Sequence, residues 1–99
     1  MFSHNYFNKY IESAEEARES FVAAMKIQDY VAARSLLHKQ FELIHTMREL
    51  GSKAYEELDI SSYGYANNYA DLFEKRLHHD VLDLIDAISG NVSKEKETR

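Results

Sequence analysis

Apolar residues recur with a helical period over most of the chain, and the longest such stretch runs from Tyr30 to Leu58. On a helix with 3.6 residues per turn, the apolar side chains of this stretch fall on one side. They are Tyr30, Ala33, Leu36, Leu37, Ile44, Met47, Ala54 and Leu58, widened by Leu43, Leu50 and Tyr55. Because such a stripe has to be covered by other elements, the pattern predicts a long central helix, 29–58, between two flanking helices.

The two flanking segments show the same helical period and predict helices over 4–26 and 67–89. The first stripe consists of Phe7, Tyr10, Ile11, Ala14, Ala17, Phe21, Ala24 and Met25. The last consists of Leu72, Phe73, Leu77, Val81, Leu84, Ile85 and Ile88. Short connections make neighbouring helices antiparallel. The predicted fold is therefore an all-α, antiparallel three-helix bundle that runs up, down and up.

Two breaks are expected between these helices. Residues Ile27-Gln28-Asp29 form the first break, and Asp29 is the predicted N-cap of the central helix. No glycine or proline marks this break, so a continuous helix through it is the alternative. The second break is expected over 59–65, where two serines and Gly64 favour a turn.

The end of the last helix is predicted at Gly90, which would supply a left-handed cap. We expect residues 1–90 to form a single helical domain. Residues 91–99 contain one apolar side chain, and we expect them to be a disordered C-terminal tail.

Gly51 lies inside the central stripe, and the stripe continues in phase beyond it. A glycine within a helix costs about 1 kcal/mol relative to alanine. We interpret Gly51 as a buried position at which a neighbouring backbone approaches closely. A locally weak point without a role is the alternative.

The composition describes a globular protein that is not built on disulfides. Hydrophobic residues make up 44% of the 99 residues, charged residues 29%, and there is no cysteine. No signal peptide and no membrane span are expected, because neither a basic region followed by an apolar run nor a long apolar segment is found. A cytoplasmic location is the expectation. With 17 acidic against 12 basic residues and a net charge of −5, we expect a protein partner rather than nucleic acid.

Two triplets have spacings that suit metal ligands. His38, Glu42 and His45 would share one helical face, and so would His79, Asp83 and Asp86. Imidazole and carboxylate together suit zinc, iron or manganese. Both triplets, however, point away from the apolar stripes, whereas metal sites in bundles project inward. We therefore expect charged faces without metal or cofactor, and a metal-binding helical protein is the alternative.

Tyrosine is abundant, with seven residues, and three of them crowd around the second expected break. Tyrosine is enriched at protein interfaces because it combines a large contact area with one polar end. Tyr63, Tyr65 and Tyr69, with Gly51, are therefore the candidate interface residues. The alternative is that the tyrosines cap the core. No catalytic motif is found, and a non-enzymatic, self-associating interaction module is the leading hypothesis.

Two stretches resemble known helical families, each over about a third of the chain. The spacing from Ala24 through Asp29 to Leu36, followed by Leu43-Ile44 and Met47, resembles the hairpin of flagellar export chaperones. The run from Lys39 to Ala54 is similar to phasins, which coat granules. The first resemblance implies an adaptor, inhibitor or export chaperone that binds a protein. The second implies a surface-coating protein with an exposed apolar stripe.

Overall fold

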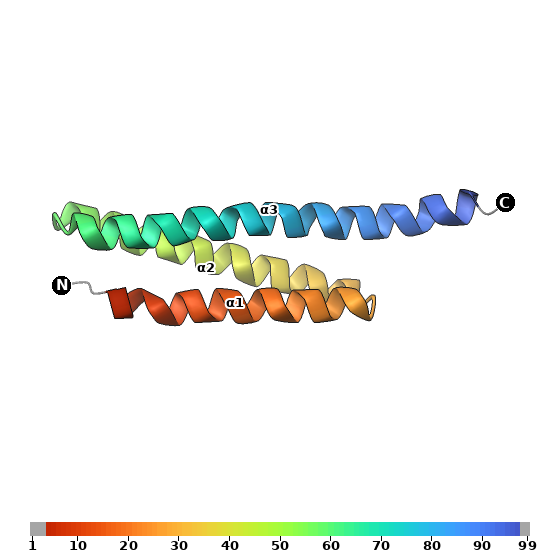
Figure 1. Ribbon diagram of the computed structural model, residues 1–99, viewed down its shortest axis with the longest axis horizontal. Coiled ribbons are helices and arrows are strands. Elements are labelled where there is room, and N and C mark those ends of the chain that lie inside the picture. The colour runs from red at the N-terminus through yellow and green to blue at the C-terminus, as the bar shows by residue number, and fades with distance from the viewer. Residues whose placement is uncertain (1–3, 98–99) are drawn as a thin grey trace.

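The computed structural model describes the backbone of residues 4–97 and the side chains of residues 6–90. Three helices and no strand occupy the described backbone: α1 (His4–Lys26), α2 (Tyr30–Glu56) and α3 (Ile60–Glu97). They run up, down and up, as Figure 1 shows, so the predicted three-helix bundle is confirmed. The molecule is elongated, with extents of 62 × 17 × 14 Å. No helix among the described residues is both long and apolar enough to cross a membrane.

Helix α2 lies at the centre of the packing. It contacts both α1 and α3 extensively, whereas α1 and α3 contact each other much less. The longest helix is α3, with 38 residues, and it projects beyond the other two (Figure 1). The tail expected over 91–99 lies outside the residues whose side chains are described.

The buried residues of α2 alternate in steps of three and four. They are Ala33, Leu37, Gln40, Ile44, Met47, Gly51 and Ala54. This spacing has the 3.5-residue period of coiled-coil packing, in which one narrow seam of each helix is buried. On α3 the same steps join Phe73, Leu77, Asp80 and Leu84, all of them buried. Two polar side chains, Gln40 and Asp80, therefore occupy core positions.

The first turn ends α1 and begins α2 within three residues. Gln28 adopts a left-handed backbone with a φ of 60°. Its N–H donates to the carbonyl of Met25 at 3.1 Å, and the N–H of Asp29 donates to that of Ala24 at 2.9 Å, which is a Schellman motif. Asp29 then caps α2, because its Oδ1 accepts from the N–H of Ala32. The predicted break and cap are confirmed, and the continuous helix is wrong.

The second turn repeats the geometry of the first. Leu58 has a φ of 62°. Its N–H donates to the carbonyl of Tyr55 at 2.9 Å, and that of Asp59 donates to the carbonyl of Ala54 at 2.8 Å. Asp59 caps α3 by accepting from the N–H of Ser62 at 3.2 Å. In each turn, a buried alanine thus precedes the capping aspartate by five residues.

The second break and the last helix end differ from their predictions. The turn occupies 57–59, so the loop predicted over 59–65 is wrong, and Gly64 is helical. Capping by Asp59 starts the helix before the serines and Gly64. The cap predicted at Gly90 is also wrong, because no described glycine has a positive φ and α3 continues through this residue.

Candidate functional site

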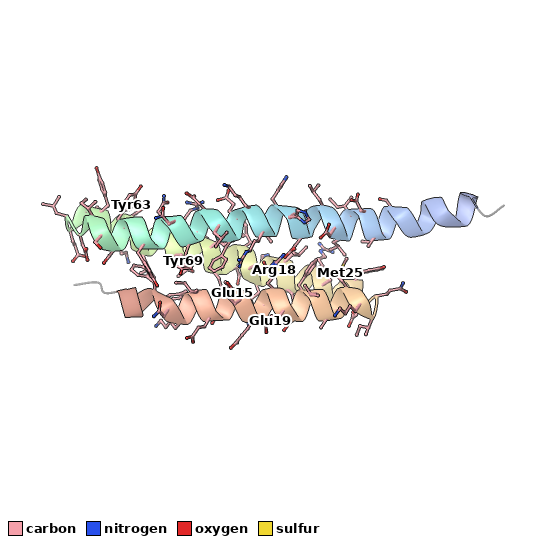
Figure 2. The ribbon with its side chains drawn as sticks, viewed as in Figure 1. Glu15, Arg18, Glu19, Met25, Tyr63 and Tyr69 are labelled. Carbon is pink, nitrogen blue, oxygen red and sulfur yellow. The ribbon has the colours of Figure 1, made fainter. Side chains whose placement is uncertain are left out.

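A buried polar cluster joins all three helices in the middle of the bundle. Arg18 of α1 lies against Asp80 of α3, with 3.4 Å between Nε and Oδ2. The side chain of Asp80 is 3% exposed and that of Arg18 is 38% exposed. Gln40 of α2 is buried beside them. Figure 2 shows Arg18 between α1 and α3. Each helix therefore contributes one polar side chain to this cluster.

Burial has the largest effect on the pKa of Asp80. It raises the pKa of this carboxyl, while the charge of Arg18 lowers it and Gln40 lowers it least. Within the described residues, Arg18 Nε, Gln40 Nε2 and Asp80 Oδ2 have no hydrogen-bond partner of normal geometry. The cluster is therefore an ion pair with incomplete hydrogen bonding. A buried ion pair is weak evidence for stability, and in some helical proteins a buried polar group fixes the register of the helices instead.

The described residues contain one group with the composition of a metal site, and it differs from both predicted triplets. Potential ligand atoms of His79, Asp80 and Asp83 lie within 4.8 Å of one another. Asp86 is exposed and does not belong to this group. The guanidinium of Arg18 already lies against Asp80, and its positive charge opposes a cation at the same oxygen. This geometry does not favour a metal.

The other triplet consists of exposed pairs rather than a cluster. Nε2 of His38 lies 2.9 Å from Oε1 of Glu42, and Nε2 of His45 lies 2.9 Å from Oε1 of Glu49. His45 therefore pairs with Glu49, one helical turn later, and not with Glu42. Such exposed pairs one turn apart contribute little to helix stability.

Replacing His38 and His45 together by alanine should change the free energy of unfolding by under about 0.5 kcal/mol per site. Both side chains are exposed, so the variant exchanges solvated groups for a good helix former. Chemical denaturation measures the change, and elemental analysis of both purified proteins measures bound metal. Stoichiometric metal that is lost in the double variant would contradict this expectation and favour the metal-binding alternative.

A second polar network joins α2 to α3 on the surface. Arg48 donates from Nη1 to Asn67 Oδ1 at 3.0 Å and from Nη2 to Asp71 Oδ1 at 2.9 Å, and it also pairs with Glu74. Hydrogen bonds to Glu74 and then to Asp71 raise the pKa of Arg48. Asn67 accepts this bond from a position inside α3. Arg48 thus pairs with both acids, and its single positive charge offsets one of their two negative charges.

Two of the candidate interface tyrosines pack within the chain. The hydroxyl of Tyr65 donates to Asn8 Oδ1 at 2.9 Å, and its ring lies 6.3 Å from that of Phe7. Tyr69 lies between the rings of Tyr65 and Phe73. Gly51 is also buried, and a Cβ at this position would lie 3.4 Å from that of Ala66. Their role as interface residues stays a prediction.

Tyr63 is different because it belongs to an apolar surface at the second turn. Its ring lies 5.1 Å from that of Tyr55, and Figure 2 shows it on the side of α3 away from α1. Tyr55 and Ile60 are exposed, and Leu58 is 82% exposed. We call Tyr55, Leu58, Ile60 and Tyr63 the tip. Sequence reasoning placed Leu58 in the covered stripe of the central helix, which is wrong, because α2 ends at Glu56 and Leu58 is exposed in the turn. Its left-handed conformation has no signal in its residue type.

Comparison with known proteins adds no relative. No family model matches the chain, and neither a curated protein nor a solved structure matches it.

Proposed function

We propose that this chain is a non-enzymatic protein-interaction module that binds through the tip. The observation that supports this function is Leu58, which combines a φ of 62° with 82% exposure. A left-handed conformation costs an L-residue with a Cβ about 1–2 kcal/mol. An exposed leucine returns almost nothing to the fold in exchange. Burial of this side chain in a partner would offset the cost of the left-handed conformation and the cost of exposing leucine to water.

The first turn supports the same argument by comparison. It has the same hydrogen bonds and the same left-handed position, but a polar residue, Gln28, occupies it. The turn geometry therefore does not demand an apolar side chain. At the second turn the leucine stands among the exposed Tyr55 and Ile60. Clustered aromatic and aliphatic side chains of this kind are typical anchors of protein interfaces.

Leu58→Gly should stabilise the fold and weaken binding. Glycine adopts positive φ without strain, so we expect about 1 kcal/mol of added stability. For a domain of this size, that raises the melting temperature by about 4–8 °C. Binding to self or to captured partners should fall, because the apolar anchor is gone. Thermal melts measure the first effect, and light scattering with affinity capture from native lysate measures the second.

Gln28→Gly is the matched control for Leu58→Gly. It relieves the same left-handed strain at the first turn but leaves the tip intact. We expect a similar stabilisation and unchanged binding. If Leu58→Gly retained full self-association and captured the same proteins as the parent, the tip would not be the binding surface.

A further inference from the structure

The tip joins two helices whose buried residues continue from one helix to the next with a helical period. The last buried residue of α2 is Ala54, and the first of α3 is Ser62. They are eight residues apart, about 2.2 turns, so both would face the same half of one continuous helix. Leu58 is four residues from each and would lie between them on that face. A straightened second turn would therefore join the two buried faces and place Leu58 among them.

The first turn lacks this continuity. The buried residues on either side of it are Ala24 and Ala33. They are nine residues apart, about 2.5 turns, so they would face opposite sides of a continuous helix. Straightening this turn would carry one buried face out of the core. Of the two turns, only the second can straighten with both buried faces kept together.

The second turn is closed without any helix-breaking residue. The chain has no proline, and no glycine lies between Ala54 and Ser62. Leu58 is held at a φ of 62°, a strain that a helical backbone would remove. Two backbone hydrogen bonds and the cap from Asp59 stabilise the closed turn. A short connection under strain favours the exchange of a helix between two copies of a chain.

We propose that two copies exchange α3, with the second turn of each copy straightened so that α2 and α3 form one helix. The α3 of each copy then packs on α1 and α2 of the other, which re-forms the helix contacts of the closed chain. Figure 1 shows α2 and α3 meeting at one end of the molecule, where α3 would swing away. The Leu58 side chains of the two copies meet where the long helices cross. This inference rests on the proposed function, since it names a second copy as the partner of the tip.

Engineered cysteines show which chain supplies α3. The protein has no cysteine, and a Cβ at Gly51 of α2 would lie 3.4 Å from that of Ala66 of α3. This is close to the separation of about 3.5–4.5 Å found in disulfides. The double variant Gly51→Cys with Ala66→Cys is kept reduced until its dimer is isolated by size exclusion, and is then oxidised. On a non-reducing denaturing gel, an exchanged dimer gives covalently linked chains, whereas a dimer of closed chains gives single chains.

Chain mixing gives a second measurement that uses the parent protein alone. Dimers of isotope-labelled and unlabelled chains are combined, and native mass spectrometry follows the mixed species. Because α3 has to leave the core before chains can part, exchanged dimers should mix at the rate of unfolding, and urea should accelerate the mixing. Mixing that is much faster than unfolding would show a contact between closed chains and overturn the exchange.

The caps of the two turns provide matched variants. Asp59→Ala should strengthen dimer formation about fivefold or more, because this cap exists only in the closed chain. Asp29→Ala removes the equivalent cap at the first turn, which both forms retain, so association should be unchanged. Leu58→Gly should weaken dimer formation about tenfold or more, since glycine relaxes the closed turn and disfavours the continuous helix. Sedimentation equilibrium measures each dissociation constant.

The outcomes separate the exchange from the function of the tip. Disulfides between chains, with opposite effects of Asp59→Ala and Leu58→Gly, support the exchange. Dimers with disulfides only within each chain overturn it, and if Leu58→Gly still weakens them, the tip binds as a surface of the closed chain. If Leu58→Gly changes neither self-association nor capture of other proteins, the proposed function fails as well. A parent chain that stays monomeric after refolding from urea at high concentration overturns the exchange alone.

Discussion

Replacing Arg18 by methionine should lower the free energy of unfolding by about 2–4 kcal/mol at neutral pH. The variant removes the cation and leaves the charge of Asp80 buried, with a side chain that is 3% exposed. Breaking a fully buried pair from one side costs more, but Arg18 is 38% exposed and solvent screens part of the interaction. Urea denaturation of parent and variant measures the difference.

The loss of stability caused by Arg18→Met should become smaller as the pH falls. Burial already raises the pKa of Asp80, and removing the charge of Arg18 raises it further. Between the unfolded value of about 3.9 and the raised folded pKa, the folded state binds more protons than the unfolded state. Stability therefore rises on acidification through this window. The difference between parent and Arg18→Met should be larger at pH 7 than at pH 5.

Two further variants test whether the effect of Arg18→Met comes from the buried charge of Asp80. Asp80→Asn should cost less than Arg18→Met, because the freed guanidinium can reach water while a buried carboxylate cannot. Arg76→Met removes the other cation that joins α1 to α3, whose pair with Glu15 is more exposed. We expect it to cost under about 1 kcal/mol, with no change between the two pH values. Equal costs for Arg18→Met and Arg76→Met would show that the buried cluster has no special role.

Gly51→Leu should destabilise the protein by about 1–3 kcal/mol through overpacking. The Cβ alone would lie 3.4 Å from that of Ala66 and 3.8 Å from the carbonyl oxygen of Tyr63. The remaining atoms of leucine have to displace α3 or adopt an unfavourable rotamer. Chemical denaturation measures the loss. Gly51→Ala should instead gain up to about 1 kcal/mol, since its single methyl fits and alanine favours the helix.

Gly64→Leu is the matched control for this overpacking. It also replaces a helical glycine, but a Cβ at Gly64 meets nothing within 4 Å. The variant should be at least as stable as the parent because leucine has the higher helix propensity. If Gly51→Leu were as stable as Gly64→Leu, α2 and α3 would not approach closely at Gly51.

The helical period of the sequence was enough to predict the fold class, the antiparallel order and the first break. These features depend on local chemistry, because an amphipathic stripe needs cover and an aspartate caps the helix that follows it. The position of Gly51 inside α2 was predictable for the same reason, since the stripe continued in phase on both sides. The second break was also encoded locally, through Asp59, which caps the helix that follows it. The more conspicuous serines and Gly64 suggested the wrong place.

The polar cluster and the tip were decided by tertiary structure. Gln40 and Asp80 occupy heptad core positions, but a stripe defined by apolar residues excludes polar side chains by construction. Which arginine reaches a buried carboxylate depends on the offset between helices, and that offset is set by packing across all three of them. The left-handed conformation of Leu58 follows in turn from closing a short connection between two packed helices. Glycine is the residue that adopts this conformation most readily. The left-handed backbone of Leu58 is therefore imposed by the packing of the closed bundle and not by the residue type.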